Sequence, residues 1–166
     1  MKKRILSFLF VLVLVLALIV PTGAIDSTSD PAMTTCETVY LEDGSYITTV
    51  LIEENTYEGD SITRTTSITK KGSKTVTCHS SEGHVRWEYT LTGNFTVVQG
   101  VSAVCTSASY THTIYDSDWS FSNGSATKSS NVAYGAGTFK QKFLFITIET
   151  ANIDISITCD VNGNLS

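Results

Sequence analysis

A strict alternation of apolar and polar positions marks the segment 85–97. Its even positions are mostly polar, and its odd positions are Val85, Trp87, Tyr89, Leu91, Gly93, Phe95 and Val97. Successive side chains of a strand point to opposite faces, so this pattern predicts a strand with one face in a core. Trp87 and Tyr89 are therefore predicted core residues.

Shorter alternating runs precede this strand. The runs 38–41 and 46–53 are joined through Glu42-Asp43-Gly44-Ser45, and Asp-Gly between two such runs predicts a hairpin. An acidic connection, 53–60, follows. The Thr-rich runs 62–69 and 74–79 are predicted to be the next two strands, around a turn at Lys71-Gly72-Ser73.

A second hairpin is predicted directly after the 85–97 strand. If residues 98–100 form a three-residue loop with Gly100 in the left-handed conformation, the register follows from the loop length. The predicted pairs are Val97 with Val101, Phe95 with Ala103 and Gly93 with Cys105. Glycine opposite a cysteine would leave room for a disulfide to reach a second sheet.

The last hairpin is predicted from the runs 142–148 and 153–159, which can pair across residues 149–152. Counted along the chain, nine to eleven short strands at regular spacing predict an all-β antiparallel sandwich. An immunoglobulin-like topology is possible but not favoured. Ile157 occupies the position two before Cys159 where that fold has a tyrosine, and only seven residues follow Cys159.

The N-terminus predicts export. Lys2, Lys3 and Arg4 precede an apolar run of 16 residues, 5–20, which is shorter than the roughly 20 residues of a spanning helix. Pro21 and small residues follow, so we expect a signal peptide at 1–24 that is cleaved after Ala24. An uncleaved membrane anchor is the alternative. Residues 25–35 are predicted to be a flexible leader, and residues 36–166 a single β-sandwich domain without a stable membrane span.

The net charge and composition of the chain limit the classes of partner and of fold that fit it. Without the signal peptide the chain has 8 basic and 16 acidic residues, a net charge of −8, which argues against a nucleic-acid partner. Nine of the carboxylates lie in residues 25–60, where there is no Lys or Arg. Ser and Thr account for 43 of the 142 residues from 25 to 166, and a chain this rich in Thr, Val, Ile and aromatics favours strands.

Four widely spaced cysteines, Cys36, Cys78, Cys105 and Cys159, remain in the mature chain. In an exported protein an even number predicts two disulfides, with three possible pairings. The sequence contains no Cys-x-x-Cys motif and no His/Cys cluster, so we predict no metal site and no cofactor.

Several motifs of the chain resemble those of a family of small secreted, Ser- and Thr-rich β-proteins from Gram-positive, often gut-dwelling, bacteria, for which no activity is known. The motifs are Glu42-Asp43-Gly44-Ser45-Tyr46, the segment 87–96, Cys105-Thr106-Ser107-Ala108-Ser109, and Thr158-Cys159 followed by residues 162–166. The resemblance implies a bacterial secreted β-protein. It also implies that Cys105 pairs with Cys159, which leaves Cys36 to pair with Cys78.

The candidate ligand site is a row of aromatic side chains. Tyr115, Trp119 and Phe121 share one face by alternation, and a row of rings on a sandwich can stack on sugars. The alternative, which the sequence favours, places Trp119 and Phe121 in the core. The three histidines, His79, His84 and His112, lie among Ser and Thr without a recognisable catalytic motif. The acidic Asp160-Val161-Asn162-Gly163-Asn164 begins like a calcium loop but lacks its closing Glu.

From these observations we predict a secreted, extracellular, non-enzymatic β-sandwich protein that acts as a binding or surface-interaction module. The partner is not defined by the sequence, and a cell-envelope or host glycan or a protein fits the prediction. The alternative is an exported antagonist, either bacteriocin-like or an enzyme inhibitor.

Overall fold

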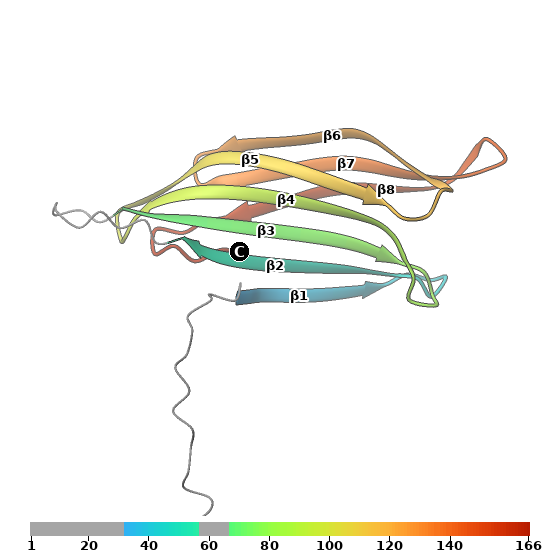
Figure 1. The fold of residues 1–166 in the computed structure, drawn as a ribbon, viewed down its shortest axis with the longest axis horizontal. Helices are drawn as coiled ribbons and strands as arrows, with labels where there is room; N and C mark the ends of the chain where they lie inside the picture. The colour runs from blue at the N-terminus through green and yellow to red at the C-terminus, as the bar shows by residue number, and fades with distance from the viewer. Residues whose placement is uncertain (1–31, 57–66) are drawn as a thin grey trace, which may run out of the picture.

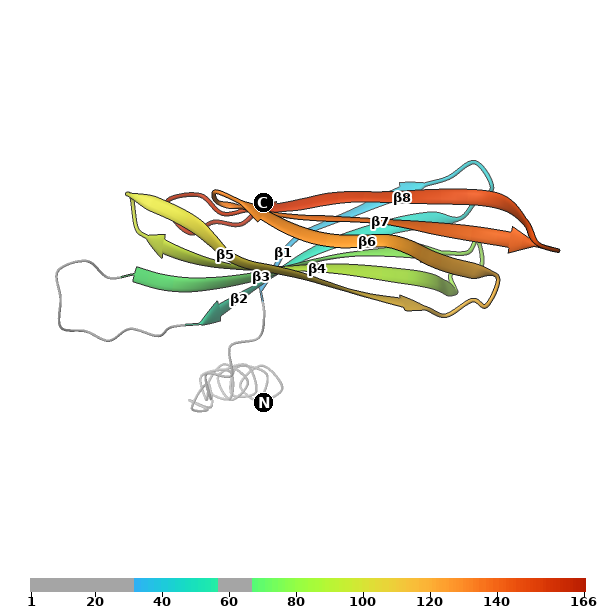
Figure 2. The same cartoon turned by 90° about the horizontal axis from the view of Figure 1, so that it is seen from above.

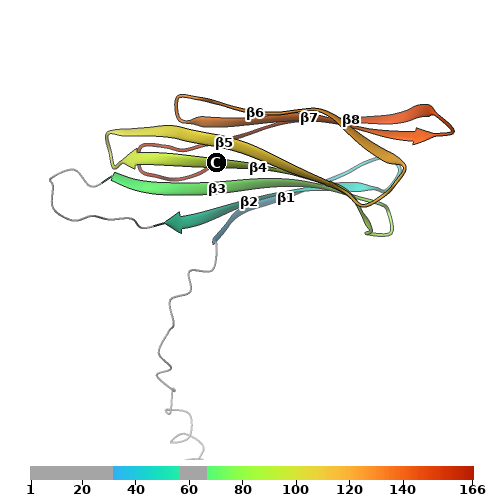
Figure 3. The same cartoon turned by 45° about the horizontal axis from the view of Figure 1, so that its top comes forward.

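A computed structural model describes residues 32–56 and 67–166 of the chain, so the predicted signal peptide and most of the predicted leader lie outside the described residues. Two antiparallel sheets face each other (Figures 1 and 3). The larger sheet contains, in spatial order, β1 (Ala32–Tyr40), β2 (Tyr46–Thr56), β3 (Ser67–His79), β4 (Val85–Val98) and β5 (Ser102–Ile114). The smaller sheet contains β6 (Trp119–Ser129), β7 (Val132–Phe143) and β8 (Ile146–Thr158). The predicted all-β antiparallel sandwich is confirmed.

Each sheet is a meander in which sequential strands are neighbours. The immunoglobulin arrangement, which the sequence disfavoured, requires Greek-key connections, and the order of these strands does not contain them. The described part has eight strands of 9 to 14 residues, fewer and longer than the predicted short strands. It contains no helix that is both long and apolar enough to cross a membrane.

The core lies between the sheets, and β4 contributes more buried hydrophobic residues to it than any other strand. Buried and half-buried residues alternate along this strand, as the sequence predicted, with the odd positions from Trp87 onward facing inward. Trp87 stacks on Phe139 of β7 with ring centroids 4.1 Å apart. Tyr89 is also fully buried, and its hydroxyl donates to the backbone oxygens of Ser125 (3.0 Å) and Ala136 (3.3 Å). Burial raises the pKa of the Tyr89 hydroxyl to about 12, so it remains a neutral donor.

Three predicted details of strand pairing are wrong. The predicted turn Lys71-Gly72-Ser73 lies inside β3, where Gly72 pairs with Gly93. The β4–β5 register is shifted, because the loop is 99–101 and Phe95, not Gly93, lies opposite Cys105. Gly100 does have the predicted left-handed conformation, with φ of 71°. The predicted 142–148 strand is interrupted by a turn at Leu144 and Phe145, so β8 begins at Ile146 and runs continuously to Thr158.

Gly93 marks a close approach of the two sheets. A Cβ atom at this position would lie 2.9 Å from the Cβ of Ala133 on β7 and 2.9 Å from the ring of Phe95. The space that the sequence suggested for a disulfide is therefore occupied by the opposite sheet. Both glycines of the Gly72–Gly93 pair serve packing, since a Cβ at Gly72 would collide with Leu165.

We predict that Gly93→Ala lowers the free energy of unfolding by about 1 to 3 kcal/mol, because the added methyl overpacks the contact with β7. In a urea titration, Ala133→Gly in the same chain should recover part of the loss, since it removes the opposing methyl. A Gly93→Ala chain as stable as the original or more so, as strand propensity alone would give, would contradict this packing.

Candidate functional site

Four connections gather at one end of the sandwich. They are residues 41–45, 80–84, 115–118 and 144–145, which link β1–β2, β3–β4, β5–β6 and β7–β8. Figures 1 and 2 show all four at the same end, with the β7–β8 connection projecting beyond the others. We call these connections and the strand residues beside them, 39–46, 79–86, 114–119 and 142–149, the loop end.

Hydrogen bonds order the connections that project less than the β7–β8 turn. The Leu41 amide donates to the Ser45 carbonyl (2.8 Å), and the Asp43 carboxylate accepts from the Ser45 amide (3.0 Å), which builds the predicted Asp-Gly hairpin. The amides of Tyr115 (2.9 Å) and Asp116 (3.1 Å) both donate to the Arg86 carbonyl. The β5–β6 connection is therefore fixed against the start of β4.

Exposed apolar side chains concentrate at the loop end. The structure describes fourteen exposed large hydrophobic residues, and ten of them lie there: Val39, Tyr40, Leu41, Val85, Tyr115, Phe143, Leu144, Phe145, Ile146 and Ile148. The other four, Val101, Val104, Tyr134 and Val161, lie toward the opposite end. Single exposed apolar residues are ordinary on a protein surface, whereas a cluster marks an interaction site.

The β7–β8 connection contributes most to this cluster. Leu144 and Phe145 form a two-residue turn with φ of 48° and 70°, between the paired residues Phe143 and Ile146. Left-handed φ at both positions is the hairpin geometry that normally selects Asn-Gly, and bulky side chains are disfavoured there. Phe145 is completely exposed and Leu144 is 74% exposed. The sequence does not predict this turn, because Leu144 and Phe145 are not among the usual turn residues.

A depression of about 520 Å³ lies beside the β3–β4 and β5–β6 connections. It is lined by Ser80, Ser81, Glu82, His84, Val85, Arg86, Tyr115 and Asp116. Most of these side chains are polar, so the depression offers hydrogen-bonding groups next to the apolar cluster. Tyr115, 59% exposed, belongs to both features.

The predicted aromatic row does not form an exposed platform. Trp119 is only 4% exposed and contacts Trp87, with ring centroids 5.9 Å apart. Phe121 is half-buried and stacks on His112 at 3.9 Å. Tyr115 lies before β6 begins, so the strand alternation that would have aligned it with the other two rings does not reach it. Of the three, only Tyr115 presents its ring to solvent.

The three histidines lie in different surroundings. His79 stacks on Tyr46 at 4.5 Å, and its Nε2 lies 3.2 Å from the Thr48 hydroxyl. His84 is exposed in the β3–β4 connection, where its Nδ1 is 3.7 Å from a Glu82 carboxylate oxygen. His112, as noted, packs against Phe121. The absence of catalytic activity remains a prediction.

The predicted Cys36–Cys78 bridge is incompatible with the register. All four cysteines are free thiols in this structure. Cys36 pairs with Val50 and Cys78 pairs with Ile47, on opposite sides of β2. Directly paired residues share a face, and positions three apart on one strand do not, so the two thiols point to opposite faces of the sheet. The Cys36 side chain is exposed, while Cys78 is buried and burial raises its pKa to about 11.

Cys105 and Cys159 approach each other at the opposite end of the sandwich. Adjacent carbonyls of the β6–β7 turn accept from their amides, Ser130 from Cys105 (2.8 Å) and Asn131 from Cys159 (3.0 Å). Both thiols are buried, and burial raises the pKa of Cys105 and brings that of Cys159 to about 11.

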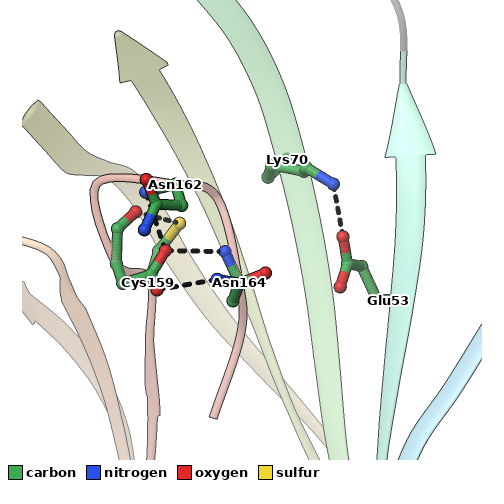
Figure 4. Close-up of polar contacts among 6 residues, drawn as sticks. Glu53, Lys70, Cys159, Asn162 and Asn164 are labelled. Atoms are coloured by element: carbon green, nitrogen blue, oxygen red, sulfur yellow. Dashed lines mark hydrogen bonds and ion pairs between the residues drawn. The ribbon is translucent and has the colours of Figure 1, made fainter. Parts of the chain in front are cut away.

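The residues that begin like a calcium loop form a closed turn instead. Asp160 Oδ1 accepts from the amides of Asn162 (2.8 Å) and Asn164 (2.9 Å), and Oδ2 accepts from the Asn164 side chain (2.8 Å), as Figure 4 shows. On the neighbouring strands Lys70 pairs with Glu53 (Figure 4). Among the described residues no three His, Cys, Asp or Glu side chains form a metal-binding group.

We predict that Asp160→Ala loosens the C-terminal turn, which holds Leu165 over Gly72. The Asn164 contacts lower the pKa of Asp160 below its ordinary value of 3.8. A group with a lowered folded pKa contributes stability above its unfolded pKa and loses it as the pH falls. Relative to the intrinsic exchange rates at each pH, protection of the amides of residues 160–166 should therefore fall in the variant, and in the original chain as the pH falls from 3.8 through the lowered pKa of Asp160. Asp154→Ala, an exposed carboxylate on β8, is the control. Equal exchange in the two variants would contradict the role of Asp160.

Comparison of the chain with protein-family models, with curated proteins and with solved structures gave no match. The resemblance to secreted Gram-positive proteins therefore stays a prediction.

Proposed function

We propose that this chain is an extracellular, non-enzymatic binding module whose binding surface is the loop end. The observation that carries the proposal is the concentration of exposed apolar side chains there, ten of the fourteen described. Water contact with such a cluster is unfavourable, so a partner that covers it gains free energy. The polar depression beside Tyr115 and Arg86 adds hydrogen-bonding groups that would orient the partner.

The extracellular location rests on the sequence. The charged start, the apolar run 5–20 and the small residues before position 25 are typical of a signal peptide. N-terminal sequencing of the protein recovered from the culture medium tests this part of the proposal. A chain that still begins at Met1 and sediments with membranes would contradict it.

We also propose that Cys105 and Cys159 form a disulfide. Its support is that the amides of both cysteines donate to adjacent carbonyls of the β6–β7 turn and that both side chains are buried, with Cys105 on β5 and Cys159 directly after β8. Two thiols must lose two protons and two electrons to an oxidant such as a disulfide exchange partner. Buried thiols with a raised pKa react slowly, so the bond would form before the sandwich closes.

The binding proposal is tested with the chain of residues 25–166 and a panel of surfaces. The panel contains peptidoglycan, insoluble polysaccharides, bacterial cells and phospholipid vesicles. A variant of the loop end, Leu144→Asn with Phe145→Gly, is compared with Val101→Ser at the opposite end. Retention on at least one surface that only the first variant loses would support the proposal. Retention that neither variant changes, or no retention at all, would contradict it.

The alternative prediction, an exported antagonist, is addressed by the same chain in growth-inhibition assays. Inhibition that disappears in the loop-end variant would make antagonism the purpose of the binding.

A further inference from the structure

The tip of the β7–β8 hairpin consists of four consecutive apolar side chains with nothing covering them. Phe143 and Ile146 close the hairpin, and Leu144 and Phe145 form the turn, with exposed fractions from 62% to 100%. Polar or glycine residues would suit this turn better. The chain therefore accepts both a disfavoured turn and exposed apolar surface at the point that projects furthest (Figures 1 and 2).

The polar residues behind the tip are basic on β7. Lys142 pairs with Thr147, one position behind the Phe143–Ile146 pair, and Lys140 pairs with Thr150 further back. A carboxylate, Glu149, first occurs opposite Gln141. The other acidic side chains of the loop end lie on the other three connections, which do not project as far as the tip in Figure 2.

From this arrangement, and resting on the proposed function, we infer that the hairpin tip inserts into the surface of a phospholipid bilayer. The turn and its closing pair span about two residue steps, or roughly 7 Å at the rise of a strand. That length matches the depth of roughly 5 to 10 Å that apolar faces reach at a membrane interface. Lys142 then lies at the level of the lipid phosphates, whose charge complements the ammonium group.

Backbone chemistry limits the insertion to this depth. A hairpin exposes unpaired amides and carbonyls along its two outer edges, and hydrocarbon cannot satisfy them. At the interface, headgroups and water can. The apolar segment also ends at Lys142 and Thr147, so deeper insertion would bury a charge.

The test is sedimentation of the chain of residues 25–166 with phosphatidylcholine vesicles, with and without phosphatidylglycerol. The segment before residue 25 is omitted because its apolar run would itself bind lipid. The original chain is expected to bind both kinds of vesicle. Leu144→Asn with Phe145→Gly should weaken binding at least about tenfold, since two large apolar side chains are removed. This variant introduces the favoured Asn-Gly turn, so it should keep or raise the thermal stability and separate loss of binding from unfolding.

Two further variants sharpen the test. Val101→Ser, which removes an exposed apolar side chain at the opposite end, should bind like the original chain. Lys140→Gln with Lys142→Gln should weaken binding to the anionic vesicles by about fivefold per lysine at low salt, with a smaller effect on phosphatidylcholine alone.

Each remaining outcome overturns the inference. The inference is wrong if the original chain binds neither kind of vesicle. It is also wrong if the Leu144→Asn, Phe145→Gly variant binds as tightly as the original chain. If vesicles fail while another surface of the panel is bound through the loop end, the proposed function stands without its lipid partner. If nothing is bound, both fall. If the original chain is a dimer without lipid and the Leu144→Asn, Phe145→Gly variant is a monomer, the tip binds a second copy of the chain instead of a bilayer.

Discussion

Replacing Trp119 with alanine is expected to lower the free energy of unfolding by about 3 to 5 kcal/mol, because the side chain is buried between the sheets against Trp87. Tyr115→Ala, which removes a mostly exposed ring four positions earlier, is expected to change it by about 0.5 kcal/mol or less. Chemical denaturation of the two variants measures both values. The comparison distinguishes a core aromatic residue from a surface one, although the alternation in the sequence places both on the same face of a strand.

Trp119→Phe serves as the control for this prediction. The Nε1 atom of Trp119 is buried without a hydrogen-bond partner among the described residues, so phenylalanine removes an unsatisfied donor together with some packing. Trp119→Phe should lower the free energy of unfolding clearly less than Trp119→Ala does. If Trp119→Ala unfolds at the same denaturant concentration as the original chain, Trp119 is not in the core and the aromatic platform becomes the better interpretation.

Oxidation of Cys105 and Cys159 is expected to raise the free energy of unfolding by about 2 to 4 kcal/mol, because the bond closes a long loop in the unfolded chain. The chain is refolded with a mixture of reduced and oxidised glutathione, and its unfolding is compared with and without reductant. Cys105→Ser with Cys159→Ser should be insensitive to reductant.

Thiol labelling provides the matching control. In the oxidised chain, denaturation without reduction should leave two reactive thiols, Cys36 and Cys78, which face opposite sides of the sheet. In the native chain only Cys36 is exposed and should react. Four reactive thiols after oxidative refolding, or a peptide that joins Cys36 to Cys105, would contradict the pairing.

Local patterns predicted those elements in which one physical requirement dominates. The alternation from Trp87 to Val97 identified β4 and its buried face, because a half-buried strand must alternate. The Asp43-Gly44 pair identified the first hairpin, where Gly44 has the expected positive φ of 81°. In both places the local preference and the tertiary structure agree.

The failures occur where tertiary contacts override local preference. The sequence predicts a turn at Gly72, but the role of this glycine is to let Leu165 approach β3. The turn at Leu144 and Phe145 contains residues that favour strands, so sequence patterns gave no reason to break the chain there. The apolar cluster of the loop end could not be predicted from the sequence either. Its apolar residues lie in or beside four connections that are far apart in the sequence, and only the folded chain brings these connections to one end.

Footprinting of the bound chain tests the central claim most directly. The chain of residues 25–166 is oxidised by hydroxyl radicals free in solution and again when bound to the surface that retains it. The account predicts protection at Tyr40, Tyr115 and the segment 143–148, and no change at Val101, Val104 and Val161. Protection at those three valines, with the loop end as reactive as in solution, would contradict binding through this end.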